Sequence, residues 1–356
     1  MASIRTFEGH THEVECVAVL PNGNFLSGSR DKIVRQWDAN TGEIIRTFMH
    51  RDDVNSLAVL PNGNFVSASG YTIRLWNTNT GGIIRTFVEQ ISFVTCVAVL
   101  PNGNFLSGSW DKNIHLWNTN TSESIASFEG HTDYVECVAV LPDGNFISGS
   151  RDTTLRLWNT ITGETIRIFE GHSHFVTCVA VLPDGNFVSG SIDKTLRIWN
   201  TKTGETIRIL KGHTSTVDCV AVLPFYGDIV SGGMDKTLRL WYTDTDTHIK
   251  IFNEHKSRVS CVAVIPDGNL VISGSYDKTL RLWKVGLPNP TNENYSRRKA
   301  TLQEVRTLPP MDIFPGGIEF QEAEKRFQNA QNNIRKTKKG RKTRKYARRS
   351  RSNKQA

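Results

Sequence analysis

Tryptophan recurs at a nearly fixed interval through most of this chain. Seven of its eight tryptophans are separated by 39, 41, 41, 41, 42 and 42 residues; they are Trp37, Trp76, Trp117, Trp158, Trp199, Trp241 and Trp283. Each ends a copy of one sequence unit, represented by residues 171–199, GHSHFVTCVAVLPDGNFVSGSIDKTLRIW. No other feature constrains the fold as strongly, because the same unit must form the same local structure seven times.

The unit alternates apolar and polar residues with a period of two, which predicts strands. Residues 175–181, 187–191, 196–199 and 206–210 are the four expected strands, and the turn residues between them leave no room for a helix. A period of about 40–45 residues is typical of one four-stranded propeller blade. We therefore predict an all-β, seven-bladed β-propeller.

The motif Gly-His followed by S-G-S-x-D-x-T-L-R-x-W resembles the WD-repeat (WD40) family of β-propellers, over about 80% of the chain. The resemblance implies a buried hydrogen-bonded tetrad in each blade, here His172, Ser189, Asp193 and Trp199. Because the same His, Ser and Asp recur in most repeats, we interpret them as structural. We accordingly expect no enzymatic activity, no cofactor and no metal.

The first strand-like segment precedes the first Gly-His. Residues 3–7, SIRTF, match the fourth-strand segments of later repeats, whereas the last repeat stops after its third strand at Trp283. We therefore expect the N-terminal strand to complete the seventh blade and to close a propeller spanning residues 1–286, which removes the free sheet edges.

The six cysteines occupy one position of the first strand: Cys16, Cys96, Cys137, Cys178, Cys219 and Cys261. Equivalent positions on packed sheets lie about 10 Å apart, beyond disulfide range, and no pair has zinc-type spacing. They are expected to be buried thiols in a reducing compartment, the nucleus or the cytoplasm. No stretch is long and apolar enough for a membrane span or a signal peptide.

Two repeats depart from the pattern. The second loses a residue at its second turn, residues 69–72, and with it the tetrad Asp, although His50, Ser67 and Trp76 remain. The third has Gln90 where the others have His. These departures are either drift in a tolerant array or the mark of a specialised sector.

Composition changes after residue 286. We expect a Pro-containing polar linker at 287–317, an amphipathic helix at 318–337 and a disordered basic tail at 338–356. Residues 325–356 carry 14 Lys and Arg and no acid, which leaves 29 basic against 35 acidic residues, a net charge of −6, in residues 1–324. The overall net charge of +8 thus combines a mildly acidic body with a strongly basic end.

The repeats differ mainly at positions that, by the resemblance, lie on the top face of the propeller, where most partners of the family bind. The residues expected to contact a protein or peptide there are Glu13, Glu15, Arg30, Phe93, Trp110, Tyr134, Arg151, Phe175, Met234, Arg258 and Tyr276. Trp110 is the one tryptophan outside the repeat register, and the shortened turn of repeat two supplies Tyr71. Aromatic side chains ringed by acids suit a peptide with an apolar anchor and a Lys or Arg.

The basic end predicts binding to RNA, DNA or a nuclear import receptor. The residues expected to do so are Lys336, Lys338, Lys339, Arg341, Lys342, Arg344, Lys345, Arg348 and Arg349. The leading interpretation is a non-enzymatic scaffold, a monomeric propeller within a complex, directed to the nucleus by its tail. An RNA- or ribosome-associated member of the family and a substrate receptor of a ubiquitin ligase remain alternatives.

Overall fold

The computed structural model describes residues 3–88, 92–224, 227–243, 248–266 and 268–285. The chain divides into two units, Met1–Leu287 and Pro288–Ala356, and every described residue belongs to the first. The linker, helix and basic tail expected after residue 286 lie outside the described residues, as does Gln90.

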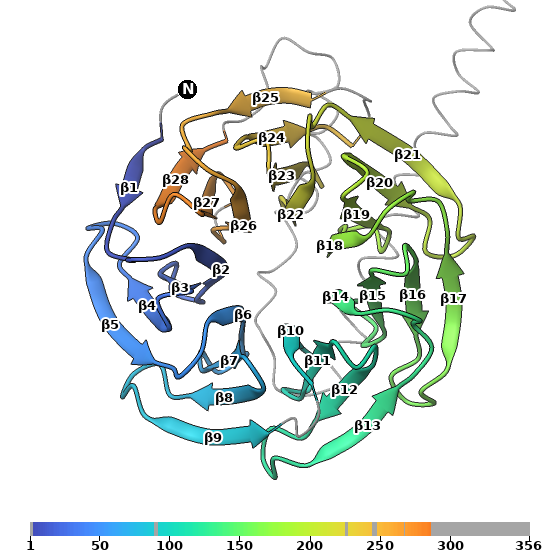
Figure 1. Cartoon of the computed structure of the whole chain (residues 1–356), viewed down its shortest axis with the longest axis horizontal. Coiled ribbons are helices and arrows are strands. Elements are labelled where there is room, and N and C mark those ends of the chain that lie inside the picture. The colour runs from blue at the N-terminus through green and yellow to red at the C-terminus, as the bar shows by residue number, and fades with distance from the viewer. Residues whose placement is uncertain (1–2, 89–91, 225–226, 244–247, 267, 286–356) are drawn as a thin grey trace, which may run out of the picture. The chain divides into compact units, whose positions relative to one another are not determined.

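The described residues form seven four-stranded antiparallel sheets, arranged as the blades of a propeller with each first strand innermost (Figure 1). Blades one to four are β2 (Val14–Val19), β3 (Phe25–Ser29), β4 (Ile33–Trp37), β5 (Ile44–Met49); β6 (Val54–Val59), β7 (Phe65–Ser69), β8 (Thr72–Trp76), β9 (Ile83–Val88); β10 (Val94–Val99), β11 (Phe105–Ser109), β12 (Ile114–Trp117), β13 (Ser124–Phe128); and β14 (Val135–Val140), β15 (Phe146–Ser150), β16 (Leu155–Trp158), β17 (Thr165–Phe169). Blades five to seven are β18 (Val176–Val181), β19 (Phe187–Ser191), β20 (Thr195–Trp199), β21 (Thr206–Lys211); β22 (Val217–Val222), β23 (Ile229–Gly233), β24 (Leu238–Trp241), β25 (His248–Phe252); and β26 (Val259–Val264), β27 (Leu270–Ser275), β28 (Leu280–Lys284), β1 (Arg5–Phe7).

The N-terminal strand closes the ring, as predicted. Strand β1 pairs antiparallel with β28, with Arg5 opposite Leu282 and Phe7 opposite Leu280. The backbone N–H of Ile4 adds a hydrogen bond to the Leu282 carbonyl at 2.7 Å. The seven-bladed all-β prediction is therefore confirmed over the described residues.

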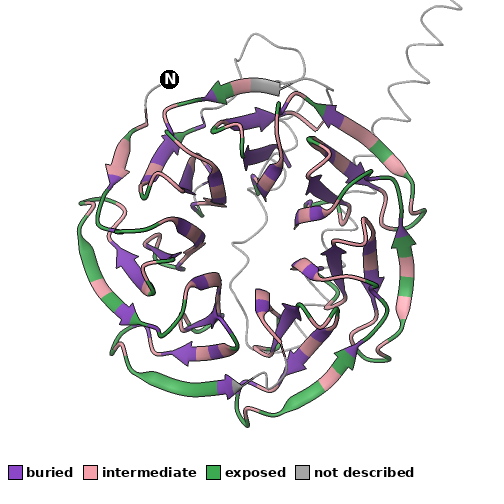
Figure 2. Ribbon diagram, viewed as in Figure 1, coloured by how far each residue is buried: buried purple, intermediate pink, exposed green. Residues whose placement is uncertain are grey.

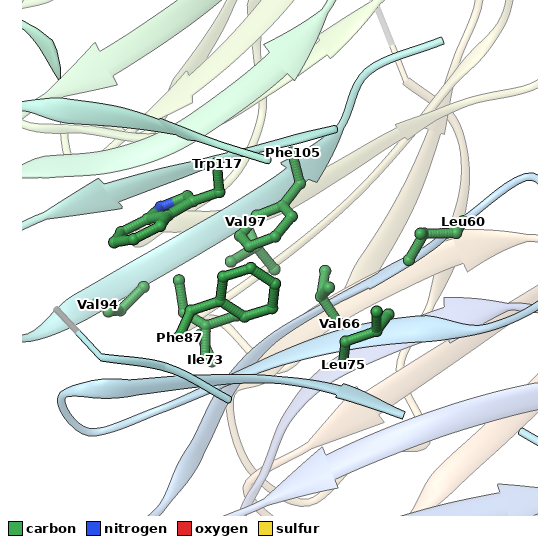
Figure 3. Close-up of a cluster of buried hydrophobic side chains, with 10 residues drawn as sticks. Leu60, Val66, Ile73, Leu75, Phe87, Val94, Val97, Phe105 and Trp117 are labelled. Atoms are coloured by element: carbon green, nitrogen blue, oxygen red, sulfur yellow. The ribbon is translucent and has the colours of Figure 1, made fainter. Parts of the chain in front are cut away.

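The hydrophobic core lies between neighbouring blades. In Figure 3, Ile73 and Phe87 of blade two pack against Val94, Phe105 and Trp117 of blade three. The Phe87 ring meets the Phe105 ring edge-on at 4.9 Å between centroids. The second strands of blades one to six are buried along their whole length, whereas the outermost strands are mostly half-buried or exposed (Figure 2). Burial of each large side chain contributes about 1.5–3 kcal/mol, so inter-blade packing dominates stability.

Close approach of adjacent blades explains the Gly of the SGS motif. A Cβ at Gly190 would lie 2.6 Å from the Cys178 sulfur and 2.8 Å from a methyl of Val217 in the next blade. Blade two has the larger Ala68 at this position, opposite Ser56 rather than a cysteine. The two changes compensate in volume, because the smaller serine oxygen makes room for the alanine methyl.

The described cysteines are all buried and form no disulfides. Burial raises the pKa of the Cys178 and Cys261 thiols to about 12, so both are poor nucleophiles. Within the described ranges, no helix has the length and apolar character required to cross a bilayer.

Candidate interaction face

Each regular blade contains a buried polar chain that fixes its turns. In blade five, His172 Nδ1–H donates to Asp193 at 2.7 Å, Ser189 donates to His172 Nε2 at 2.7 Å, and the Trp199 indole donates to Ser189 at 2.8 Å. Burial alone would raise the pKa of Asp193, but the hydrogen bond from His172 holds it well below its usual value. The serine oxygen is thus engaged on both sides, which suits a structural role.

Blade two keeps this chain without its acid. His50 Nε2 accepts from Ser67 at 2.7 Å, and His50 Nδ1–H donates to the Phe48 carbonyl at 3.2 Å. Burial, with a contribution from the Arg74 charge, lowers the pKa of His50 to about 4. The imidazole is therefore neutral in the folded protein at physiological pH.

In blade three the hydrogen-bonded side chains are arranged differently. His115 stands on β12 where blade five has Arg197, and its Nε2–H donates to Asp111 at 2.8 Å. Burial alone would raise the pKa of Asp111, but this hydrogen bond keeps the pKa below its usual value. The His115 and Asp111 side chains are 17% and 19% exposed, against 0% and 7% for His172 and Asp193. The His–Asp pair of blade three is thus more accessible than the corresponding pair of blade five.

Backbone hydrogen bonds bring the predicted partner-binding positions together in pairs. The Trp110 N–H donates to the Phe93 carbonyl at 3.0 Å, and the Arg151 N–H donates to the Tyr134 carbonyl at 2.9 Å. The same bond joins Arg30 to Glu13, Ile192 to Phe175, Met234 to Thr216, and Tyr276 to Arg258. We call these twelve residues, with Asp53 and Tyr71 of blade two, the top-face ring.

Six of the fourteen residues in the top-face ring form a continuous series of contacts between planar groups, which we call the aromatic ladder: Tyr71, Phe93, Trp110, Tyr134, Arg151 and Phe175. Ring centroids lie 6.2 Å apart for Tyr71 and Phe93, 4.6 Å for Phe93 and Trp110, and 5.2 Å for Trp110 and Tyr134. The Arg151 guanidinium then lies 5.0 Å from the Tyr134 ring and 5.6 Å from the Phe175 ring. Tyr71 is 57% exposed and Trp110 40% exposed, so the ladder presents aromatic surface to solvent.

The opposite part of the ring is charged. The guanidinium groups of Arg30 and Arg258 lie 4.9 and 5.0 Å from the Tyr276 ring. The Tyr276 hydroxyl donates to Glu15 at 2.8 Å, and Arg30 also donates to Glu15, at 2.5 Å. Arg258 pairs with Asp218 at 3.0 Å. These cations are therefore already engaged within the protein.

The position before the first-strand cysteine faces the next blade. Thr177 donates to the Val217 carbonyl at 2.5 Å and to the Gly190 carbonyl at 3.0 Å, and Thr95 and Ser260 make the corresponding bonds. Blades one, four and six carry acids there instead. Asp218 Oδ2 has no hydrogen-bond partner among the described residues, and burial raises the pKa of this carboxyl to about 6 despite the Arg258 charge.

The sequence did not reveal which predicted residues are already paired. Arg151 hydrogen-bonds to Glu136, and Arg258 pairs with Asp218. His174 also packs edge-on against Phe175, at 4.5 Å between ring centroids. The sequence did contain a signal for these ion pairs: an acid directly precedes the first-strand cysteine, and the top-face ring contains arginines. Met234 is 52% exposed and lies outside the ladder.

Seven four-stranded blades, stabilised by these buried side-chain hydrogen bonds, define a WD-repeat propeller. The WD40 family model, described as WD domain, G-beta repeat, matches residues 1–38, 42–77, 81–118, 122–159, 163–200, 204–242 and 246–284. The chain therefore belongs to the WD40 family. Propellers of this family generally bind protein partners and are typically non-catalytic scaffolds.

A solved structure has the same fold. The WD40 β-propeller domain of Doa1 superimposes with a TM-score of 0.72 at 24% identity, covering 82% of this chain and 98% of that domain. Nuclear distribution protein PAC1 of Arthroderma benhamiae is 46% identical over 54 residues, and nuclear distribution protein nudF 1 of Talaromyces marneffei is 48% identical over 46 residues. Each match covers 13% of this chain and only 12% and 10% of those relatives, so the likeness is limited to roughly one repeat.

Proposed function

We propose that this protein is a non-enzymatic interaction scaffold that captures a segment of a protein partner on the aromatic ladder. The observation that carries the proposal is the exposure of Tyr71 and Trp110 within a continuous series of ring contacts across blades two to five. Exposed aromatic rings held in place by their neighbours are typical anchors of protein interfaces.

Preorganisation favours binding at this surface. Trp110 is held between Phe93 and Tyr134, with interplanar angles of 28° and 12°, and its backbone is fixed by the bond to Phe93. A ring that is already fixed loses little conformational freedom on binding, so more of its buried area contributes to affinity. The carboxylate of Asp53, in the same top-face ring, favours a partner segment with positive charge.

The polar chains do not argue for catalysis. Ser189 both donates to His172 and accepts from Trp199, and the same arrangement recurs in blades one, four, six and seven. A set repeated around the ring, with the His side chain fully buried, supports a structural assignment.

Affinity capture tests the proposal. The full chain and its Trp110→Ala variant are used as bait, with Ile161→Ala as the matched control because Ile161 is 96% exposed outside the ladder. Proteins retained by wild type and by Ile161→Ala, but lost with Trp110→Ala at unchanged melting temperature, are the expected result. Identical capture by all three baits would contradict the proposal.

The charge of the basic C-terminal segment, residues 325–356, supports a second candidate function. With 14 Lys and Arg and no acid in residues 325–356, we infer nuclear targeting through an import receptor or salt-sensitive binding to RNA or DNA. Association with ribosomes is one form of this function. Co-sedimentation with total RNA, measured from about 50 to 200 mM salt, should decline steeply for the full chain and should not change with Trp110→Ala.

A further inference from the structure

Three tyrosines of the top-face ring occupy comparable environments. Tyr134 and Tyr276 each have a guanidinium over the ring, from Arg151 in one case and from Arg30 and Arg258 in the other. Each guanidinium is in turn held by a carboxylate, since Arg151 hydrogen-bonds to Glu136, Arg30 to Glu15 and Arg258 to Asp218. The repeated unit is therefore a tyrosine ring, a cation and an acid.

Tyr71 has the ring and the acid but not the cation. Its ring stands at 85° to that of Phe93, so the two form a corner rather than a closed stack. No described cation lies over the Tyr71 ring, which is 57% exposed. One acid is nevertheless close, because the Asp52 carboxylate would lie 3.0 Å from a Cβ added at Gly70, the residue before Tyr71.

The carboxylates at this corner lack a described cation within ion-pair distance, although Asp52 attracts the Arg74 charge from farther away. In the part of the chain that the structure describes, the carboxylates of Asp52 and Asp53 form no ion pair or side-chain hydrogen bond, unlike Glu15, Glu136 and Asp218. A cation over the Tyr71 face would gain both ring and carboxylate attraction, as Arg151 and Arg30 do within the molecule.

We propose that the corner formed by Tyr71 and Phe93, with Asp52 and Asp53, is a subsite for a cationic side chain, lysine or arginine, of the bound protein segment. The inference rests on the proposed function, because it deepens the same binding face. In this proposal the two ends of the aromatic ladder have different roles. The Arg151 end is already filled by an internal cation, whereas the Tyr71 end takes its cation from the partner.

A random library of 12-residue peptides displayed on phage provides the probe. It is selected at about 150 mM salt on four full-length baits: wild type, Trp110→Ala, Tyr71→Ala and Tyr71→Phe. All four share the basic tail, so its binding is common to every selection. Peptides selected by wild type are then synthesised with Lys or Arg and with Gln at the enriched position, and their affinities are compared.

Wild type and Tyr71→Phe should enrich one basic position and prefer Lys or Arg over Gln about two- to fivefold, the effect of an exposed cation–π contact. Tyr71→Ala should still bind through Trp110 but lose that preference. An unchanged basic preference with Tyr71→Ala would overturn the subsite while leaving the proposed function intact. If wild type selects no peptides that depend on Trp110, both are overturned.

Discussion

Ser3 and Glu254 are joined by two hydrogen bonds across the point where the ring closes. The Ser3 backbone N–H donates to Glu254 Oε1 at 3.0 Å, and its hydroxyl donates to Oε2 at 2.7 Å. Arg281 of β28 donates to the same carboxylate at 2.7 Å. Blades one, four, five and six have glycine at the position of Glu254 and so cannot make this side-chain contact.

Replacing Glu254 by glycine should therefore weaken closure. The change removes the acceptor for Ser3 and Arg281, and we expect a loss of about 1–2 kcal/mol in the free energy of unfolding, measured by urea denaturation. Glu170→Ala is the matched control, since Glu170 is an exposed acid at the preceding position of the blade-five loop. Equal stabilities of the two variants would show that the contact contributes nothing to closure.

Acid should destabilise the protein partly through His50. Its folded-state pKa is about 4 and the ordinary value is 6.5, so the unfolded chain takes up a proton that the native chain excludes. Stability should then fall as the pH drops from about 6.5 to about 4. His50→Gln should flatten this part of the stability curve, measured by urea denaturation at a series of pH values. Parallel slopes for wild type and His50→Gln would refute the assignment.

Asp218→Thr should stabilise the protein at pH 7. A threonine there can donate to the carbonyls of Val259 and Gly232, as Thr177 does to Val217 and Gly190, and it removes a buried carboxylate oxygen without a partner. We expect a gain of about 1 kcal/mol, reduced by the lost pair with Arg258.

The pH dependence of the stabilisation expected for Asp218→Thr serves as a control for its cause. The Asp218 pKa is raised to about 6 from 3.8, so wild-type stability contributed by the neutral carboxyl is lost as the pH rises from about 4 to 6. The advantage of Asp218→Thr should accordingly shrink on acidification through that range. A constant advantage would mean that ionisation of Asp218 is not the cause.

Thr153 has a positive φ of 72°, which is unfavourable for a β-branched residue. Thr153→Asn should raise the free energy of unfolding by about 1 kcal/mol, because asparagine tolerates this conformation. Lys194→Asn, at the equivalent position with φ 69°, should gain less since lysine is not β-branched. Urea denaturation of both variants measures the difference, and a larger gain at Lys194 would contradict the explanation.

The fold could be predicted because each repeat has the same types of strand and turn residues at the same positions. The turn at Asp184–Gly185, for example, needs a positive φ that glycine provides, and it recurs in most blades. Closure could also be predicted, because residues 3–7 match the fourth-strand segments of the repeats and the last repeat stops after its third strand at Trp283.

The details of the candidate site were less predictable, because they depend on side chains from adjacent blades. Sequence identified Trp110 and Phe175 as variable face positions, but not that Arg151 would fill the space between Tyr134 and Phe175. Nor did it indicate that His115 would hydrogen-bond to Asp111 in blade three. Such contacts follow from the distance between neighbouring blades and from rotamers, which a repeat pattern does not specify.

The dissociation constant of a captured partner, measured for wild type and for Trp110→Ala, tests the central claim most directly. A hot-spot aromatic contributes at least about 2 kcal/mol, so we predict binding weakened about 30-fold or more, at an unchanged melting temperature. A dissociation constant within about twofold of wild type would contradict the assignment of the aromatic ladder as the binding surface.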